Sequence, residues 1–307
     1  MCSALISALV FVSPLSGQGG GEALFLLLPI GAQAVGMGEA VVAQQIGSEG
    51  VWWNPAAIAG GGPAEVALHH SETIVGQGNV ATFVIPSRRF GTFAPSINIM
   101  DLEKQIATDE QGLPQGVILP TNVIYSLTYA AAPLPFLRAG MTVKHMELRV
   151  RCTGQCTDLP AGGTVSNGVD LGAQLSFGRT PLTVGVATRN LGVEKGSTSP
   201  ARLDVGASYR IEALDRYTQD VQVYGMTDVV SKTALDSASL RLGGDVVFEQ
   251  RVHLRGGYII DRANGSGASI GFGIAAGKLV FDLARSFGGL TSDGDKPPTY
   301  FSLRYQW

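Results

Sequence analysis

Apolar and polar side chains alternate with a period of two along most of the chain, from residue 64 to the last residue. The alternation is clearest over 202–212, where Leu203, Val205 and Tyr209 share an apolar face and charged or small residues occupy the other face. Successive side chains of a β-strand point to opposite faces, whereas side chains on a helix repeat about every 3.6 residues. The pattern therefore predicts a chain of β-strands and argues against a helical bundle.

About fourteen segments alternate in this way, and bacterial transmembrane barrels have an even number of antiparallel strands. Most of the segments approach or exceed the roughly 9 to 11 residues that cross a bilayer. The predicted strands are 64–73, 79–87, 89–102, 120–132, 136–151, 166–178, 181–191, 201–212, 219–231, 238–249, 252–262, 266–276, 278–287 and 298–307. We predict an all-β fold, a transmembrane antiparallel β-barrel of about fourteen strands, formed by residues 63–307.

The composition supports a membrane barrel. Charged residues make up 15% of the chain, below the roughly 25% of an average soluble domain. Beyond the N-terminus no apolar run reaches the roughly 18 residues of a membrane helix. The net charge of -3 gives no reason to expect nucleic-acid binding.

The predicted connections alternate in length. Those after even-numbered strands are mostly short, and those after odd-numbered strands are mostly longer, as at 103–119, 152–165 and 288–297. Outer-membrane barrels have short periplasmic turns and long outer loops. The lengths therefore predict that both chain ends lie on the periplasmic side.

The N-terminus resembles a secretory signal peptide, which we place at residues 1–18. Residues 5–12 form an apolar core and residues 13–17 offer small side chains for cleavage, although no Lys or Arg precedes the core. A second apolar run, 23–30, is too short to span a membrane and is expected to lead in an extended form into the next segment.

Residues 31–62, the hatch segment, break the alternation. They are rich in Gly and Ala and contain adjacent tryptophans, Trp52 and Trp53. Pro55 disfavours a helical Asn54 and favours a helix start at Ala56. A barrel of about fourteen strands is wider than the roughly eight-stranded barrels that side chains alone fill. We therefore predict that residues 19–62 form an N-terminal extension and a helical hatch inside the lumen.

The tryptophans have two interpretations: they wedge the hatch into the barrel, or they anchor a hydrophobic ligand. Gly36-x-Gly38 matches part of a dinucleotide fingerprint, but it lacks a third glycine and the βαβ context. We interpret these glycines as packing positions of the hatch.

The stretch GAQAVGMGEAVVA…WWNPAAIAG resembles the N-terminal signature of the PorV/PorQ family of outer-membrane proteins, relatives of the FadL-type barrels. Residues 170–192 and 240–258 are similar to later strands of that family. The matching hatch positions are Gly36, Gly38, Trp52, Trp53, Asn54, Pro55 and Ala56.

This resemblance implies a monomeric barrel in the bacterial outer membrane, without enzymatic activity. It implies a role in type IX-type protein secretion, with secretion components or exported cargo as partners. The alternative is a FadL-like channel for hydrophobic compounds such as long-chain fatty acids. Membrane lipid and the barrel assembly machinery are expected partners in both cases, and no cofactor is expected.

Cys152 and Cys156 remain after removal of the signal peptide, which would carry Cys2 away. An even pair of cysteines in an exported protein favours a disulfide. The CxxxC spacing also suits half of a metal site, but no His follows closely to complete it. We predict a disulfide in an outer loop and no metal.

The last predicted strand ends on an aromatic residue. Its apolar face consists of Phe301, Leu303, Tyr305 and Trp307. This pattern is similar to the assembly signal of bacterial outer-membrane proteins, although a final strand of a soluble sheet is the alternative.

The remaining polar residues give little support for catalysis. His69 and His70 precede Ser71 and Glu72, but alternation places the two histidines on opposite faces, and adjacency on a strand supplies no oxyanion hole. A further set of charged residues is expected to face the lumen and to pair there or with the hatch. These are Asp170, Arg189, Arg202, Asp204, Arg210, Arg241, Asp245, Arg255, Asp282 and Arg304.

Overall fold

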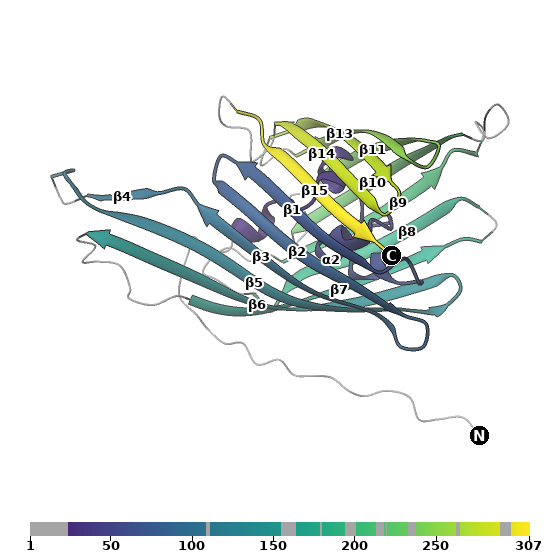
Figure 1. The fold of residues 1–307 in the computed structure, drawn as a ribbon, viewed down its shortest axis with the longest axis horizontal. Helices are drawn as coiled ribbons and strands as arrows, with labels where there is room; N and C mark the ends of the chain where they lie inside the picture. Colours follow the sequence, from purple (N-terminus) through teal and green to yellow (C-terminus); the bar gives the residue numbers. More distant parts are fainter. Residues whose placement is uncertain are drawn as a thin grey trace, which may run out of the picture.

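The computed structural model describes residues 24–108, 111–154, 164–178, 180–193, 201–212, 218, 220–232, 238–261, 265–288 and 296–307. In this part of the chain one antiparallel sheet closes into a barrel around the hatch segment (Figure 1). The strands are β1 (Glu65–Thr73), β2 (Gly76–Ser87), β3 (Gly91–Leu102), β4 (Gln105–Thr108), β5 (Pro114–Leu134), β6 (Leu137–Gly154), β7 (Thr164–Ser176), β8 (Leu182–Leu191), β9 (Arg202–Arg210), β10 (Val221–Lys232), β11 (Ser239–Phe248), β12 (Val252–Ile260), β13 (Gly267–Ala276), β14 (Leu279–Gly288) and β15 (Thr299–Gln306).

The sheet closes through two pairings between strands that are not consecutive in the chain. β1 pairs with β15, so that His69 lies opposite Ser302, and β3 pairs with β5. β4 also pairs with β5, at residues 114–118, next to the part of β5 that pairs with β3. β3 and β4 therefore occupy one strand position of the barrel. The circumference consists of fourteen strands, which confirms the predicted fold class.

β4 was not predicted, because residues 103–119 were expected to be a loop. Gln105, Leu113 and Gln115 are exposed, and residues on both faces of this extension are in contact with solvent. Because neither face is buried, the sequence shows no period of two there. β5 consequently begins at Pro114, ahead of the predicted start at residue 120.

The outer surface of the barrel is apolar and the inner surface is polar. Leu127, Leu254 and Ile270 point outward, with 49%, 48% and 57% of their surface exposed. Buried charged residues such as Asp170 and Asp282 point into the lumen on other strands. A soluble barrel has the reverse distribution, whereas a transmembrane barrel presents an apolar band to lipid.

The two rims of the barrel differ. One rim, here called the turn end, carries short connections such as 88–90, 249–251 and 277–278, together with the C-terminus. Exposed aromatic residues surround it, as expected for a membrane interface. They include Phe90, Phe136, Phe177, Tyr209, Tyr305 and Trp307. The opposite rim, here called the loop end, carries the longer connections, and β5 and β6 reach beyond it (Figure 1).

The hatch segment and the residues before it contain only short helices. They are η1 (Leu24–Leu27), α1 (Ala32–Gly36), η2 (Gly47–Glu49), α2 (Gly50–Trp53) and η3 (Pro55–Ile58). η1 corrects the expectation of a fully extended segment over 23–30. Within the described residues, no helix is long and apolar enough to cross a bilayer.

The apolar core lies inside the barrel, between the hatch segment and the inner wall. Val41, Ile46 and Trp52 pack with inward-facing residues such as Ile124 and Met146. Asn54 is extended, with φ of -149°, as expected for a residue that precedes proline. The short helix η3 begins at Pro55, one residue before the predicted start at Ala56. The hatch is therefore a buried element that fills the lumen.

Candidate functional site

Two glycines of the hatch segment bring its backbone into direct contact with the barrel wall. The Cα of Gly36 lies against Gly271 of β13, and Gly38 lies against Gly257 of β12. Gly38 also has φ of +61°, which disfavours a side chain, and its N–H donates to Ser269 Oγ at 3.1 Å. Only glycines allow so close an approach, so the predicted packing role of this motif matches the geometry.

The buried carboxylate of Glu49 holds the first turn of α1. Its oxygens accept hydrogen bonds from the N–H groups of Gln33, at 3.2 Å, and Ala34, at 2.8 Å. These are two of the N–H groups that a helix leaves without an internal partner. Gly31 precedes α1 with φ of +92°, and a Cβ there would overlap the Glu49 carboxylate.

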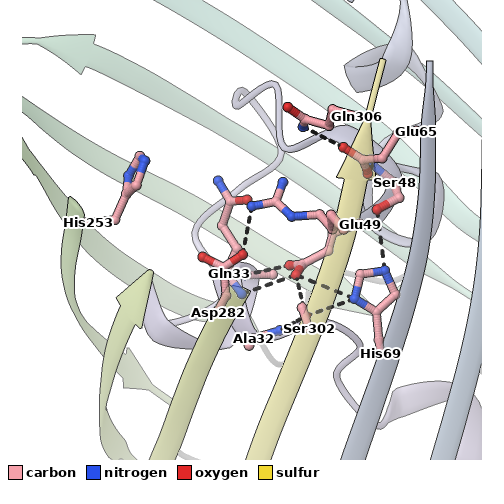
Figure 2. Close-up of polar contacts among 12 residues, drawn as sticks. Ala32, Gln33, Ser48, Glu49, Glu65, His69, His253, Asp282, Ser302 and Gln306 are labelled. Atoms are coloured by element: carbon pink, nitrogen blue, oxygen red, sulfur yellow. Dashed lines mark hydrogen bonds and ion pairs between the residues drawn. The ribbon is translucent and has the colours of Figure 1, made fainter. Parts of the chain in front are cut away.

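Glu49 belongs to a buried group that joins the hatch to the wall (Figure 2). We call this group, which consists of Ala32, Ser48, Glu49, His69 and Ser302, the Glu49 cluster. Ser302 Oγ donates to Glu49 at 2.9 Å and accepts the Ala32 N–H at 2.9 Å. His69 Nδ1 lies 2.8 Å from Ser302 Oγ, and His69 Nε2 lies 3.3 Å from Ser48 Oγ. β1 and β15 therefore both bind the hatch.

These distances assign a role to each hydrogen in the cluster. Because Ser302 uses its only hydrogen on Glu49, His69 Nδ1 acts as the donor to Ser302 Oγ. Nε2 of the neutral ring then accepts from Ser48. The hydroxyl of Ser302 is thus bonded on every side and fully buried, so this Ser-His-Glu set fastens two elements and has no free nucleophile.

The environment of Glu49 favours its neutral form. Glu49 lies in the hatch and not in a spanning strand, and it is 0% exposed. Burial raises its pKa to about 7, although the nearby guanidinium of Arg304 acts in the opposite direction. Asp282 adds a smaller increase.

A second carboxylate, Glu65, holds the hatch near the turn end. It accepts from the Ser48 N–H at 2.9 Å and from Gln306 Nε2 at 2.7 Å. Gly47, with φ of +58°, leaves room for this carboxylate beside the hatch backbone. Glu65 therefore binds η2 from the wall, whereas Glu49, the last residue of η2, binds α1.

Asn54 joins the other side of the hatch to β7. Its amide nitrogen donates to the carbonyl of Val42 at 2.6 Å and to that of Ala173 at 3.3 Å. Its amide oxygen accepts the Ala56 N–H at 3.0 Å. A Cβ at Gly172 would overlap this oxygen. The amide thus both donates and accepts, and it joins two parts of the hatch to each other and to the wall.

Three cations lie over the tryptophans of α2. Arg189 and Arg241 lie 5.0 Å and 5.6 Å from the ring centre of Trp53, and Lys144 lies 5.9 Å from that of Trp52. These are distances at which cations are attracted to aromatic faces. The Trp53 indole N–H also donates to the carbonyl of Ile30, just before the hatch segment, at 2.9 Å.

A small apolar cavity, here called the Trp cavity, lies beside both tryptophans. Its volume is about 20 Å³, and part of its wall is the apolar segment 25–30. The full lining is Phe25, Leu26, Leu28, Ile30, Trp52, Trp53, Asn98, Ile124, Lys144, Arg189 and Asn190. The tryptophans therefore pack the hatch against the wall and also line a cavity. Both interpretations of these residues, as a wedge and as an anchor for a hydrophobic ligand, stay open.

Wider cavities open on either side of the hatch. A cavity of about 1180 Å³ lies at the loop end, lined partly by Asp101 and Thr121, three residues beyond Asn98 and Ile124 on the same strands. Cavities of about 390 Å³ and 520 Å³ lie at the turn end and share Gln33 and His253. The hatch is the narrow point between two open vestibules.

The lumen-facing charges pair as the sequence analysis expected. Arg255 and Arg304 both bind Asp282, at 2.6 Å and 2.7 Å, and Asp245 lies 3.4 Å from Arg255. Arg241 pairs with Glu39 of the hatch at 2.9 Å. Such pairs satisfy charges that burial alone would penalise.

Other predicted residues lie away from the hatch. His70 points outward, opposite to His69, as alternation predicts. Tyr305 and Trp307 stack at the outer surface of the turn end, 5.8 Å apart, and their role as an assembly signal stays a prediction. Cys152 lies near the end of β6 and is disulfide-bonded. Cys156 lies outside the described residues, so its pairing with Cys152 stays a prediction.

Sequence reasoning missed the Glu49 cluster. The available signal was Glu49 itself, an acid within a stretch of small and apolar residues. Such an acid, if buried, requires donors. The sequence did not indicate that the donors would come from α1 and from Ser302, which is 253 residues away.

No protein-family model matches the sequence, and no curated protein matches it significantly. Solved structures with the same architecture do match. The CymD monoaromatic hydrocarbon channel superposes with a TM-score of 0.59 at 14% identity, over 94% of this chain and 99% of that one. The toluene transporter TbuX of Ralstonia pickettii gives 0.58 at 14% identity, over 90% and 98%.

A FadL homologue of Pseudomonas aeruginosa superposes with a TM-score of 0.55 at 12% identity, over 91% of this chain and 99% of that one. These findings give no support to the narrower resemblance to the PorV/PorQ family. They agree with the fourteen-strand barrel and its N-terminal hatch. The chain therefore has the fold of the FadL-like outer-membrane hydrocarbon transporters.

Proposed function

We propose that the chain is an outer-membrane channel that admits small hydrophobic compounds, with the hatch segment closing the lumen. The observation that carries this proposal is the Trp cavity, an aromatic-lined space between the hatch and the loop end. The chain's own apolar side chains, Phe25 and Leu26 among them, fill the space around it. A hydrophobic compound that displaces them would find an apolar site already formed.

The shared fold supports the same proposal. Structures with this fold include proteins described as a monoaromatic hydrocarbon channel and a toluene transporter. The apolar outer band and the aromatic residues at the turn end suit an outer membrane. A non-enzymatic channel also agrees with a buried Ser302 that has no access to substrate.

Uptake measurements test the proposal. In cells without their own hydrocarbon channel, expression of the protein should raise the uptake rate of radiolabelled toluene several-fold above the empty vector. Ile124→Trp, which fills the Trp cavity from the wall, should return uptake to the vector level. Leu127→Trp, on the outer face of the same strand, should leave uptake unchanged.

Two controls make this result decisive. The protein must fractionate with the outer membrane and show a heat-modifiable gel shift, as a folded barrel does. If the folded protein gives no more toluene uptake than the vector, the channel proposal is wrong. Finding it in the cytosol would refute the proposed location.

A role in protein secretion remains the second candidate, and the comparisons do not support it. One observation favours it: β4, β5 and β6 project beyond the loop end and expose Ile106 and Leu113, at 65% and 61%. An exposed projection suits partner binding better than transport. Co-purification of secretion components with the native chain, and their loss in Ile106→Asp, would support this role.

A further inference from the structure

The Trp cavity has two cations in its wall, Lys144 and Arg189. The rest of the lining is apolar except for Asn98 and Asn190. Beside such a space, cations ordinarily attract a carboxylate ligand through charge-assisted hydrogen bonds. On that basis alone, the cavity resembles a site for a fatty acid. The contacts of the two cations indicate a different ligand.

Each cation already has a carboxylate partner. Lys144 Nζ lies 2.6 Å from Asp170 Oδ2 and donates to Asn190 Oδ1 at 3.0 Å. Arg189 places Nε and Nη2 on Asp204 Oδ2, at 2.7 Å and 2.6 Å. Both carboxylates are almost completely buried. The charge of each cation is therefore compensated within the wall.

The third cation over the tryptophans shows the same arrangement. Arg241 lies over Trp53 and pairs with Glu39 of the hatch at 2.9 Å. Among the described residues, all three cations that lie over Trp52 or Trp53 thus have a carboxylate at hydrogen-bond distance. The cations hold the indole rings in place and offer no uncompensated positive charge to a ligand.

We propose that Asp170 and Asp204 determine the ligand class of the Trp cavity: by neutralising Lys144 and Arg189, they make it a site for uncharged hydrophobic compounds and exclude carboxylates. The proposal rests on the proposed function, because it concerns the same cavity. An entering carboxylate loses its hydration and meets cations that are already neutralised. An uncharged compound has no such cost and gains contact with the indole rings.

Toluene and benzoate are a matched pair of probes, since a methyl group in one takes the place of the carboxylate in the other. Binding is read as quenching of tryptophan fluorescence in purified protein at pH 8, with detergent alone as the blank. A Trp307→Phe background restricts the signal to Trp52 and Trp53, because the chain has 3 tryptophans. We expect benzoate to bind at least about ten-fold more weakly than toluene. A factor of about ten in affinity corresponds to the loss of one charge-assisted hydrogen bond.

Removing a partner carboxylate should reverse this preference. Asp170→Asn frees Lys144, and the new amide oxygen still accepts the Asn190 N–H that Asp170 accepts at 2.7 Å. Benzoate affinity should rise about ten-fold, with toluene affinity little changed. Asp204→Asn should act in the same way through Arg189. Asp101→Asn, an equal change of charge at the exposed loop end, should alter neither affinity.

The outcomes separate this proposal from the proposed function. If wild-type protein binds benzoate as tightly as toluene, Asp170 and Asp204 do not exclude carboxylates, although the channel proposal stands. If both aspartate variants fold and neither gains benzoate affinity, the assignment is also overturned. If either variant fails to assemble, the wild-type ratio still decides. If wild-type protein binds neither compound, the channel proposal itself fails.

Discussion

The hatch meets the barrel differently on its two sides. On the α1 side, glycines bring the backbones together and the Glu49 cluster supplies buried hydrogen bonds to β1 and β15. On the tryptophan side, glycines of β6 and β8 also lie against the hatch backbone, and Asn54 and Gln174 join it to β7 by hydrogen bonds. A cavity of about 20 Å³ lies beside the indole rings there. Both sides are close-packed at these contacts, but the tryptophan side also has a cavity, which the chain's own apolar residues partly line.

This difference indicates which side opens. Close backbone contact and buried hydrogen bonds are lost together if α1 leaves the wall, and unpaired buried groups are costly. Displacement of the apolar residues 25–30 costs their packing, which a hydrophobic ligand restores, and one hydrogen bond, from the Trp53 indole N–H to the Ile30 carbonyl. We therefore expect α1 to stay attached to the barrel while the tryptophan side admits the ligand.

The largest effect should come from filling the contact on the α1 side. A Cβ at Gly257 would overlap the backbone of Gly38. Gly257→Val should detach α1, at a cost of about 3 kcal/mol or more, because neither backbone has room to shift. Limited proteolysis should then cut within residues 31–38.

The neighbouring Gly256 is a matched control, since a Cβ there meets nothing within 4 Å. Gly256→Val should leave the hatch protected. If both variants keep α1 protected, the close contact does not hold this side, and the comparison between the two sides loses its basis.

Sequence reasoning succeeded where one residue type has one physical role. Alternation predicted the fourteen strands because each has one lipid face and one lumen face. The extended backbone of Asn54 was predicted because the following proline disfavours a helical conformation there. β4 was missed because exposure on both faces removes the period of two.

Partners distant in the sequence were beyond that reasoning. The contact between Gly38 and Gly257 follows from where α1 meets β12, and no local pattern encodes that meeting. The pairing of Lys144 with Asp170 is a similar case. Asp170 was predicted to face the lumen, but its distance from Lys144 depends on the register of β6 and β7.

The next effect is a pH dependence confined to the α1 side. Burial raises the pKa of Glu49 to about 7, from an ordinary value of 4.5. Folding therefore takes up a proton between these two pH values. The contribution of Glu49 to the free energy of unfolding is therefore greatest below pH 4.5. It falls by up to roughly 3 kcal/mol as the pH rises to about 7. Hydrogen exchange of residues 31–38 should accelerate over this window.

Glu49→Gln should abolish this pH dependence while keeping an acceptor for one of the two N–H groups of α1 that Glu49 binds. The other groups facing Glu49 are His69, Asp282 and Arg304. An unchanged pH dependence in Glu49→Gln would assign the titration to one of them. Equal acceleration around Trp52 and Asn54 would show that the two sides do not respond separately.

A smaller effect is expected from the amide that holds the tryptophan side. Asn54→Leu keeps a similar size but leaves the carbonyl of Val42 and the N–H of Ala56 without this partner. The cost should be about 1–3 kcal/mol. Exchange should quicken around residues 50–58, with the barrel strands unaffected, because their pairing does not involve Asn54. A rise of similar size at residues 31–38 would contradict the independence of the two sides.

The smallest effect should follow from substitution of Phe25. This residue lies in the wall of the Trp cavity and packs against the core. Phe25→Ser removes a side chain that competes with a ligand, so the fraction of molecules with an open cavity rises. Toluene affinity should increase by a factor of roughly two to five, since the apparent affinity follows that fraction. Fluorescence quenching of Trp52 and Trp53 measures it, with Phe90→Ser, exposed at the turn end, as the control. Weaker toluene binding in Phe25→Ser would show that Phe25 forms part of the ligand site, and that the tryptophan side opens by another route.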